Sequence, residues 1–175
     1  MNKLFIVVII ILLGMVYPKW SEVSEKVQEH QTTRKEYLQT EYPWLSNDLY
    51  KLYNSRSEEY NVHLTLALAF IKHESNGKIV RSRKNRNGTR DYGRFQVNTR
   101  HKEDNPRELL KDELNSYYGF YYISRCLKHS NYNLPEAIRK YNQGINGTRS
   151  RYKNWKYVER ILTTYINTRD KTLNI

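Results

Sequence analysis

The chain has 175 residues, which is enough for one domain with its own hydrophobic core. Its 30 Lys and Arg against 18 Asp and Glu give a formal net charge of +12. Such a basic balance favours an anionic partner, which could be nucleic acid, a membrane surface or an acidic polysaccharide. The single cysteine, Cys126, excludes an intramolecular disulfide and a cysteine-based metal site.

An apolar run follows Lys3 and extends over residues 4–17, interrupted by Gly14. Its length is typical of the hydrophobic region of a signal peptide and is short of the ~20 residues that a transmembrane helix needs. Because no small-residue cleavage site follows, an uncleaved anchor with Trp20 at the interface stays open, as does a buried core helix. We therefore predict that residues 1–20 are a signal peptide or N-terminal membrane anchor. The protein is then expected in the periplasm or cell envelope, either free or anchored to the inner membrane.

The exported part is predicted to hold one folded domain. Residues 21–45 are polar and charged with a weak helical period, which indicates a linker or a loose helix. The domain itself is expected to span 46–168, with 169–175 as a tail. It should begin at a helix that Ser46 caps.

Helices dominate the predicted elements. Apolar residues crowd most of the circumference of residues 62–71, which indicates a central buried helix. The alternation over residues 92–97 suits a short strand or a hairpin arm. Downstream helices are predicted at 106–114, 114–128, 134–141 and 155–166. The expected fold class is mainly α, an α+β arrangement of helices with one short β-hairpin.

Glu74 ends the central apolar helix, just before the stop signal of Asn76 and Gly77. The C-terminus of a helix repels negative charge, and apolar surroundings raise the pKa of a carboxyl group. Both effects favour a protonated Glu74 near neutral pH, as a general acid requires. The alternative is an ordinary exposed acid at a helix end.

A second acid, Asp91, follows a stretch at residues 78–90 that contains six Lys or Arg. Asp91 either caps a turn through its side chain or takes part in catalysis. The basic stretch either is a solvated loop or binds an anionic partner. His73 lies beside Glu74, but the other histidines show no ligand spacing near it, so we predict a structural role and no metal.

These motifs resemble those of two related groups that have the lysozyme-like fold and cut the glycan strands of peptidoglycan. The stretch from Glu74 to Arg100 is similar to the active-site region of chicken-type lysozymes, including the separation of its two acids. Residues 46–166 resemble the soluble-lytic-transglycosylase family more widely. That likeness is carried, in order, by Glu74-Ser75, Gly93-x-x-Gln96-Val97, Asn115-x-x-x-Gly119, Ala137 to Gly144, and Tyr157-Val158 with Ile161.

Within that family, the stretch from Asn87 to Asn98 is similar to the small transglycosylases that open the wall for secretion systems, pili or flagella. Two departures stand out. Arg94 replaces a residue that is usually apolar, and the disulfides of chicken-type lysozymes are absent. The second departure favours the bacterial group.

The resemblance implies a peptidoglycan lytic transglycosylase without a cofactor. Glu74 would be the general acid and base that cleaves the MurNAc–GlcNAc β-1,4 linkage and leaves 1,6-anhydro-muramyl ends. Supporting roles would fall to Ser75, Gln96 and Asn98, which hydrogen-bond the sugar, to Tyr141, which positions Glu74, and to Asn142, which shapes its turn. The implied partners are peptidoglycan glycan strands and a secretion, pilus or flagellar apparatus. Neither nucleic acid nor a membrane beyond the N-terminal segment is expected.

Three alternatives stay open. A hydrolytic lysozyme would use Glu74 together with Asp91 as nucleophile or charge stabiliser. A non-catalytic wall-binding protein would keep the fold without needing the acid. A nucleic-acid-binding module would use the positive charge, but it would have no use for an export segment, and the sequence carries no zinc-finger, RNP or helix-turn-helix pattern.

Overall fold

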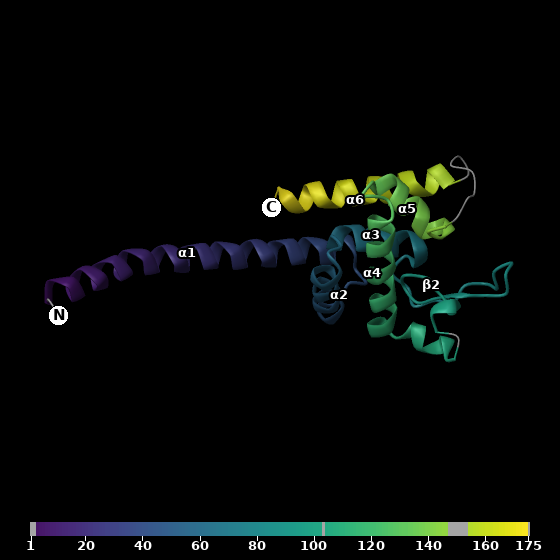
Figure 1. Cartoon of the computed structure of the whole chain (residues 1–175), viewed down its shortest axis with the longest axis horizontal. Coiled ribbons are helices and arrows are strands. Elements are labelled where there is room, and N and C mark those ends of the chain that lie inside the picture. The colour runs from purple at the N-terminus through teal and green to yellow at the C-terminus, as the bar shows by residue number, and fades with distance from the viewer. Residues whose placement is uncertain (1–2, 103, 147–153, 175) are drawn as a thin grey trace.

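A computed structural model describes residues 3–102, 104–146 and 154–174, with side chains from Glu22 onward. Over these residues the chain forms six α-helices, two short 3-10 helices and one two-stranded hairpin (Figure 1). The buried side chains form one core that the helices share. The predicted mainly helical fold with a short hairpin is therefore confirmed.

The longest helix, α1 (Lys3–Glu41), projects from the rest of the molecule, and the N-terminus lies at its far end (Figure 1). Its last turns join the core, because Leu38 is fully buried and α1 packs beside α6 (Trp155–Leu173). The side chains of the predicted leader lie outside the described part of the chain. Within the residues whose side chains are described, no helix is long and apolar enough to cross a membrane.

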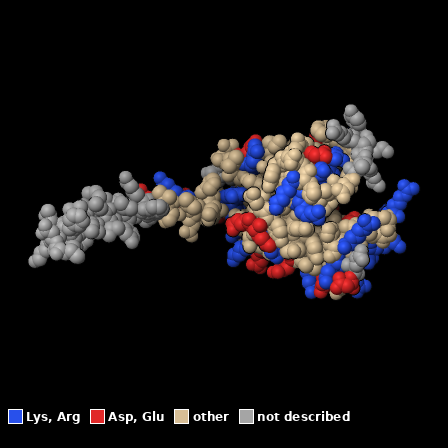
Figure 2. All heavy atoms as spheres, viewed as in Figure 1, with Lys and Arg blue, Asp and Glu red and all other residues tan. Residues whose placement is uncertain are grey.

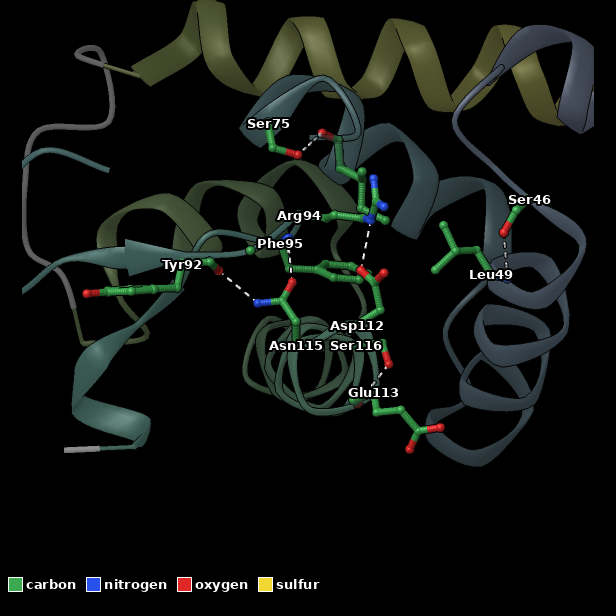
Figure 3. Close-up of polar contacts among 12 residues, drawn as sticks. Ser46, Leu49, Ser75, Tyr92, Arg94, Phe95, Asp112, Glu113, Asn115 and Ser116 are labelled. Carbon is green, nitrogen blue, oxygen red and sulfur yellow. Dashed lines mark hydrogen bonds and ion pairs between the residues drawn. The ribbon is translucent and has the colours of Figure 1, made fainter. Parts of the chain in front are cut away.

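Two helices lead from α1 to the centre of the domain. The hydroxyl of Ser46 caps α2 (Asn47–Tyr60) by accepting a hydrogen bond from the Leu49 N–H at 3.3 Å, as predicted (Figure 3). Every residue at 64–71 of α3 (Leu64–Ser75) is buried, which makes α3 the central helix of the core. It ends at Asn76, which adopts a left-handed conformation with φ of 53°. The last turn of α3 thus emerges from the core and carries Glu74 with it.

The hairpin pairs β1 (Asp91–Tyr92) with β2 (Val97–Asn98) in antiparallel register. Each strand has two residues, so most of the alternating stretch at 92–97 forms the turn rather than a strand. Gly93 has φ of +75°, and a Cβ there would overlap the side-chain amide of Asn115. Glycine is required because the conformation is left-handed and the space is taken.

Asn115 fixes this turn from the neighbouring helix. Its Nδ2 donates to the carbonyl of Tyr92 at 2.7 Å, and its Oδ1 accepts from the Phe95 N–H at 2.9 Å (Figure 3). Nδ2 also donates to the carbonyl of Leu109 at 2.9 Å. These bonds use both hydrogens and the oxygen of the buried amide, and they join two segments of backbone, the hairpin and η2. The hairpin is thereby held against the start of α4.

The remaining elements follow the hairpin: η1 (Thr99–His101), η2 (Pro106–Leu110), α4 (Asp112–Lys128), α5 (Leu134–Gln143) and α6. The helix expected at 106–114 is a 3-10 turn, and α4 begins two residues after it. Figure 1 shows α4 between α2 on one side and the hairpin on the other. Gly119 allows this close packing, because a Cβ there would overlap the ring of Phe95.

Candidate active site

A cavity of about 760 Å³ lies between the end of α3, the hairpin with the loop before it, and helices α4 and α5. Six of the seven residues predicted for the site line it: Glu74, Asp91, Gln96, Asn98, Tyr141 and Asn142. The structure thus brings together residues that lie up to 68 positions apart (142 − 74) in the sequence.

Ser75 is the exception. Its hydroxyl donates to the Ile71 carbonyl at 3.2 Å within the last turn of α3, and it is not among the described residues that line the cavity (Figure 3). The expectation that Ser75 hydrogen-bonds the sugar therefore has no support from its position. Ser75 is one residue from Glu74 on a helix, so its side chain points about 100° away around the helix axis.

Glu74 is partly buried in the cavity wall. Burial is the main reason that its pKa rises from 4.5 to about 7, and the charge of Asp91 raises it further. The hydrogen bond from Tyr157 acts in the opposite direction and lowers the pKa. A carboxyl group of this kind is partly protonated at neutral pH, as the position at the end of an apolar helix predicted.

The hydrogen bond to Glu74 comes from α6. Tyr157 donates its hydroxyl hydrogen to Oε1 of Glu74 across 83 positions of sequence. Sequence reasoning placed Tyr157 in the motif of the closing helix and gave it no part in the site. That motif was the available signal, since a buried tyrosine hydroxyl usually has a hydrogen-bond partner.

Tyr141 was predicted to position Glu74, and the structure shows it near Glu74 but with its hydroxyl bonded to another segment. It lies close enough for the charge of Glu74 to raise its pKa, after the larger effect of burial. Its hydroxyl, however, donates to the Phe95 carbonyl at 2.8 Å, and its ring packs against Phe70 with centroids 4.4 Å apart. Tyr141 therefore ties α5 to the hairpin turn and walls the cavity, while Tyr157 holds the carboxyl group.

Asp91 lies in polar surroundings. Its Oδ1 accepts a hydrogen bond from Nδ2 of Asn98 at 2.7 Å, and its Oδ2 accepts one from Nδ2 of Asn85 at 3.0 Å. Both amides also donate to the Thr89 hydroxyl. Both carboxylate oxygens of Asp91 therefore have a side-chain amide as hydrogen-bond donor. Asp91 thus organises the loop before the hairpin and presents its charge to the cavity.

Gln96 and Asn98, the two amides predicted to bind the sugar, differ in which of their hydrogen-bonding atoms lack a partner in the described part of the chain. The amide nitrogen of Gln96 donates to the carbonyls of Gly93 at 2.7 Å and Val80 at 3.3 Å. Its oxygen has no partner in the described part of the chain, so it can accept from a hydroxyl group. The amide of Asn98 is occupied at both ends, because its oxygen also accepts from the Arg100 N–H at 3.2 Å. Asn98 therefore acts as a support for Asp91.

His73 does not line the cavity and bonds instead to α6. Its Nε2 forms a hydrogen bond with the Thr164 hydroxyl of α6 at 2.8 Å. Within the described ranges, no group of three or more His, Cys, Asp or Glu side chains is placed to hold a metal ion. The position of His73 agrees with a structural role.

Positive charge borders the cavity. Arg86 and Arg100 belong to its lining, and both are exposed. Figure 2 shows Lys and Arg side chains along the side of the molecule where the hairpin and its preceding loop lie. This border would attract an anionic polymer, and the attraction should weaken as salt screens it.

A helical domain with a short hairpin, and a partly buried glutamate in a cavity at the end of its central helix, define the lysozyme-like class. The family model described as the transglycosylase SLT domain matches residues 51–162, and the chain belongs to this family. The matched span includes Glu74, Asp91, Tyr141 and Tyr157. The family indicates a glycan-cleaving transglycosylase with peptidoglycan as its substrate. No curated protein and no solved structure matches the chain.

Proposed function

We propose that this domain is a peptidoglycan lytic transglycosylase that cleaves the MurNAc–GlcNAc β-1,4 linkage with Glu74 as both general acid and general base. One observation carries the proposal: burial raises the pKa of Glu74 to about 7 in the wall of a large cavity. A group whose pKa lies near the working pH can both give and take a proton efficiently. Membership of the SLT family supplies the class of substrate.

The reaction would proceed in two steps on one carboxyl group. Protonated Glu74 gives its proton to the glycosidic oxygen, and the bond from that oxygen to the muramic acid C1 breaks through an oxocarbenium-like transition state. The C6 hydroxyl of the same sugar then attacks C1, and the Glu74 carboxylate takes the proton of that hydroxyl. The product is a 1,6-anhydro ring, and no water is consumed. Because the attack is intramolecular, orientation of the sugar replaces activation of water.

Neighbouring residues would support these steps. The hydrogen bond from Tyr157 stabilises the carboxylate form of Glu74 between the two proton transfers. The free amide oxygen of Gln96 would accept a hydrogen bond from the sugar. The rings of Tyr118 and Tyr122 line the cavity and offer faces on which a sugar can stack. Asn142, at the end of α5, would contribute a further polar contact.

Hydrolysis by a lysozyme mechanism is a second candidate, and the surroundings of Asp91 favour it. Asp91 lines the same cavity as Glu74, and its charge acts on the pKa of Glu74. Asn85 and Asn98 hold it through both oxygens. In this mechanism Asp91 would attack C1 or stabilise the positive charge, and water would complete the reaction.

Mass spectrometry of digested sacculi tests the proposal directly. Anhydro ends are lighter than reducing ends by one water, so each product identifies its own mechanism. We expect anhydro-muramyl products from the wild type and none from Glu74→Gln. Reducing ends alone would establish the hydrolase. A folded wild type that binds sacculi and releases no fragment would leave the non-catalytic wall-binding protein as the answer.

We also propose that the protein is exported and acts in the periplasm or cell envelope. The apolar run at residues 4–17 and the location of peptidoglycan outside the cytoplasmic membrane support this. Service to a secretion, pilus or flagellar apparatus rests on the resemblance of the stretch from Asn87 to Asn98. Fractionation of cells that make the full chain tests the location, and recovery in the cytosol alone would contradict export.

A further inference from the structure

A second group of aromatic rings lies on α4 outside the cavity. Tyr117 and Tyr121 are one helical turn apart, and their rings are nearly parallel, with an interplanar angle of 10° and centroids 6.3 Å apart. Their side chains are 39% and 37% exposed. Tyr60, at the end of α2, meets both rings edge-on at 6.0 and 6.2 Å. We call Tyr60, Tyr117 and Tyr121 the tyrosine face.

The surface beside the tyrosine face is hollowed. A cavity of about 400 Å³ there is lined by residues that include Tyr60, Tyr121, Tyr132, the cations Arg125 and Lys128, and one acid, Glu59. Tyr132 adds another ring that is 62% exposed. A concave surface with several exposed aromatic rings is a common arrangement at binding sites.

Positive charge accompanies these rings. The guanidinium of Arg125 lies 5.8 Å from the ring centroid of Tyr121, and that of Arg56 lies 5.7 Å from the centroid of Tyr117. Arg56 is paired with Glu59. Over the ranges that the structure describes, neither Arg125 nor Lys128 forms an ion pair. Two cations beside the hollow thus have no acidic partner in the described part of the protein.

The tyrosine face continues from the candidate active site. Tyr117 meets Tyr118 edge-on with centroids 5.1 Å apart, and Tyr118 lines the large cavity. The ring of Tyr118 also packs against that of His101, another lining residue, with centroids 5.4 Å apart. Arg125 acts on this side as well, because its charge lowers the pKa of His101 after the larger effect of burial. An unbroken series of rings therefore leads from the large cavity around α4.

We propose that the tyrosine face is a second glycan-binding site, which holds a carboxylate-bearing, β-linked polysaccharide strand where it leaves the cavity. Sugar rings would stack on Tyr117 and Tyr121, and Arg125 and Lys128 would pair with carboxylates that the strand carries. The inference rests on the proposed function, since the same polymer would occupy the cavity and the face. Aromatic rings with arginine also suit single-stranded nucleic acid, but continuity with the cavity of a peptidoglycan-cleaving domain favours the glycan.

The test measures binding without cleavage, in a Glu74→Gln background. Titration with purified long glycan strands that keep their carboxylates compares this parent with two variants. Tyr117→Ala combined with Tyr121→Ala should weaken binding about tenfold, because two stacking faces are lost. Arg125→Gln should weaken it about threefold at low salt and make binding less sensitive to added salt. Thermal unfolding by circular dichroism monitors the fold.

Matched controls come from α6. Tyr165 also carries an arginine guanidinium over its ring, at 5.5 Å, and Arg160 is exposed. Tyr165→Ala and Arg160→Gln remove the same side-chain types away from the tyrosine face. Both should bind the strands as the parent does.

Each outcome decides the proposal. Unchanged strand binding in the double tyrosine variant overturns it, as does a loss confined to single-stranded DNA. If the double variant does not fold, Arg125→Gln decides, and unchanged binding and salt dependence overturn the proposal. Digestion of sacculi by the wild-type protein tests the proposed function separately. If the wild type digests sacculi and the double tyrosine variant binds glycan strands as its parent does, only the second site is refuted.

Discussion

The two walls of the cavity give the same chemical group opposite surroundings. Glu74 comes from the end of the most apolar helix, where burial raises its pKa to about 7 and Tyr157 supplies a hydrogen bond. Asp91 comes from a polar hairpin, where two side-chain amides donate to its two oxygens. An apolar wall suits a carboxyl group that must carry a proton, and an amide-lined wall suits a carboxylate whose two oxygens accept hydrogen bonds.

This difference follows from the elements that supply each acid. Glu74 follows eight successive buried residues of α3, and burial at this end of the helix disfavours the charged form and raises the pKa of Glu74. Asp91 begins the hairpin, and Asn85 and Thr89 of the preceding loop form a polar network beside its carboxylate. The comparison teaches that the element that carries an acid, together with the side chains packed around it, decides whether its surroundings are apolar or rich in hydrogen-bond donors.

The strongest way to break the comparison is to remove the protonated group. Glu74→Gln keeps the shape and an acceptor for Tyr157, but it cannot give or take a proton. We expect the release of fragments from sacculi to fall about 10²–10⁴-fold, with an unchanged circular dichroism spectrum. Glu113→Gln, on an exposed position of α4, should keep full activity. An active Glu74→Gln enzyme would refute the assignment of the acid.

The raised pKa also predicts a pH dependence of stability. The pKa of Glu74 is about 7 in the folded chain against an ordinary 4.5, so the folded state holds the proton more tightly than the unfolded state. The stability contributed is complete below about pH 4.5 and is lost as pH rises through about 7, a change of about 3 kcal/mol. Thermal unfolding of wild type and Glu74→Gln at pH 4.5 and 8 measures it. The two proteins should diverge at pH 8, with the wild type relatively weaker, and parallel curves would contradict the prediction.

Tyr157→Phe sharpens the comparison by changing the apolar wall alone. The hydrogen bond from Tyr157 lowers the pKa of Glu74, so its loss should raise that pKa. We expect the alkaline limb of the activity profile to move to higher pH and the maximal rate to fall about tenfold. Tyr165→Phe on the same helix is the control. An unshifted limb would show that Tyr157 does not act on the reacting carboxyl group.

Asp91→Asn changes the polar wall and should have the smallest effect on rate. Transglycosylation needs no second acid, so we expect sacculus digestion to fall by less than about threefold. Hydrolysis would instead fall by about 10²-fold or more, because the nucleophile or stabilising charge would be gone. Asp104→Asn, on an exposed position, controls for the loss of one charge. Rates and product masses together separate the two mechanisms.

Much of the fold could be predicted because its signals are local. The Ser46 cap, the apolar circumference of α3 and the stop at Asn76 depend on neighbours within one turn of helix. The hairpin strands were harder to delimit, because Asn115 fixes their turn from 20 or more positions away. The alternating pattern alone could not show that the residues from Gly93 to Gln96 form a turn.

The sequence predicted which residues form the candidate site better than it predicted what each of them does there. The order of the motifs identified six residues that the fold places in one cavity. The hydrogen-bond partner of Glu74 could not be identified in this way, because it depends on how α6 packs against α3. Arg94 illustrates the same limit. Its guanidinium pairs with Asp112 at 2.8 Å (Figure 3). It also lies 5.8 Å from the ring centroid of Trp44, so its unusual charge has tertiary partners that a sequence pattern does not reveal.

The amide of Asn115 has a consequence for engineering. It joins the backbone of Tyr92, Phe95 and Leu109, which belong to the hairpin and to η2. A chimera that imports the hairpin from a related enzyme must therefore import a compatible residue 115 as well. Asn115→Asp would already spoil the junction, since an ionised carboxylate offers no hydrogen to the two carbonyls. Loop grafting in this scaffold should treat the hairpin and the first turns of α4 as one exchangeable cassette.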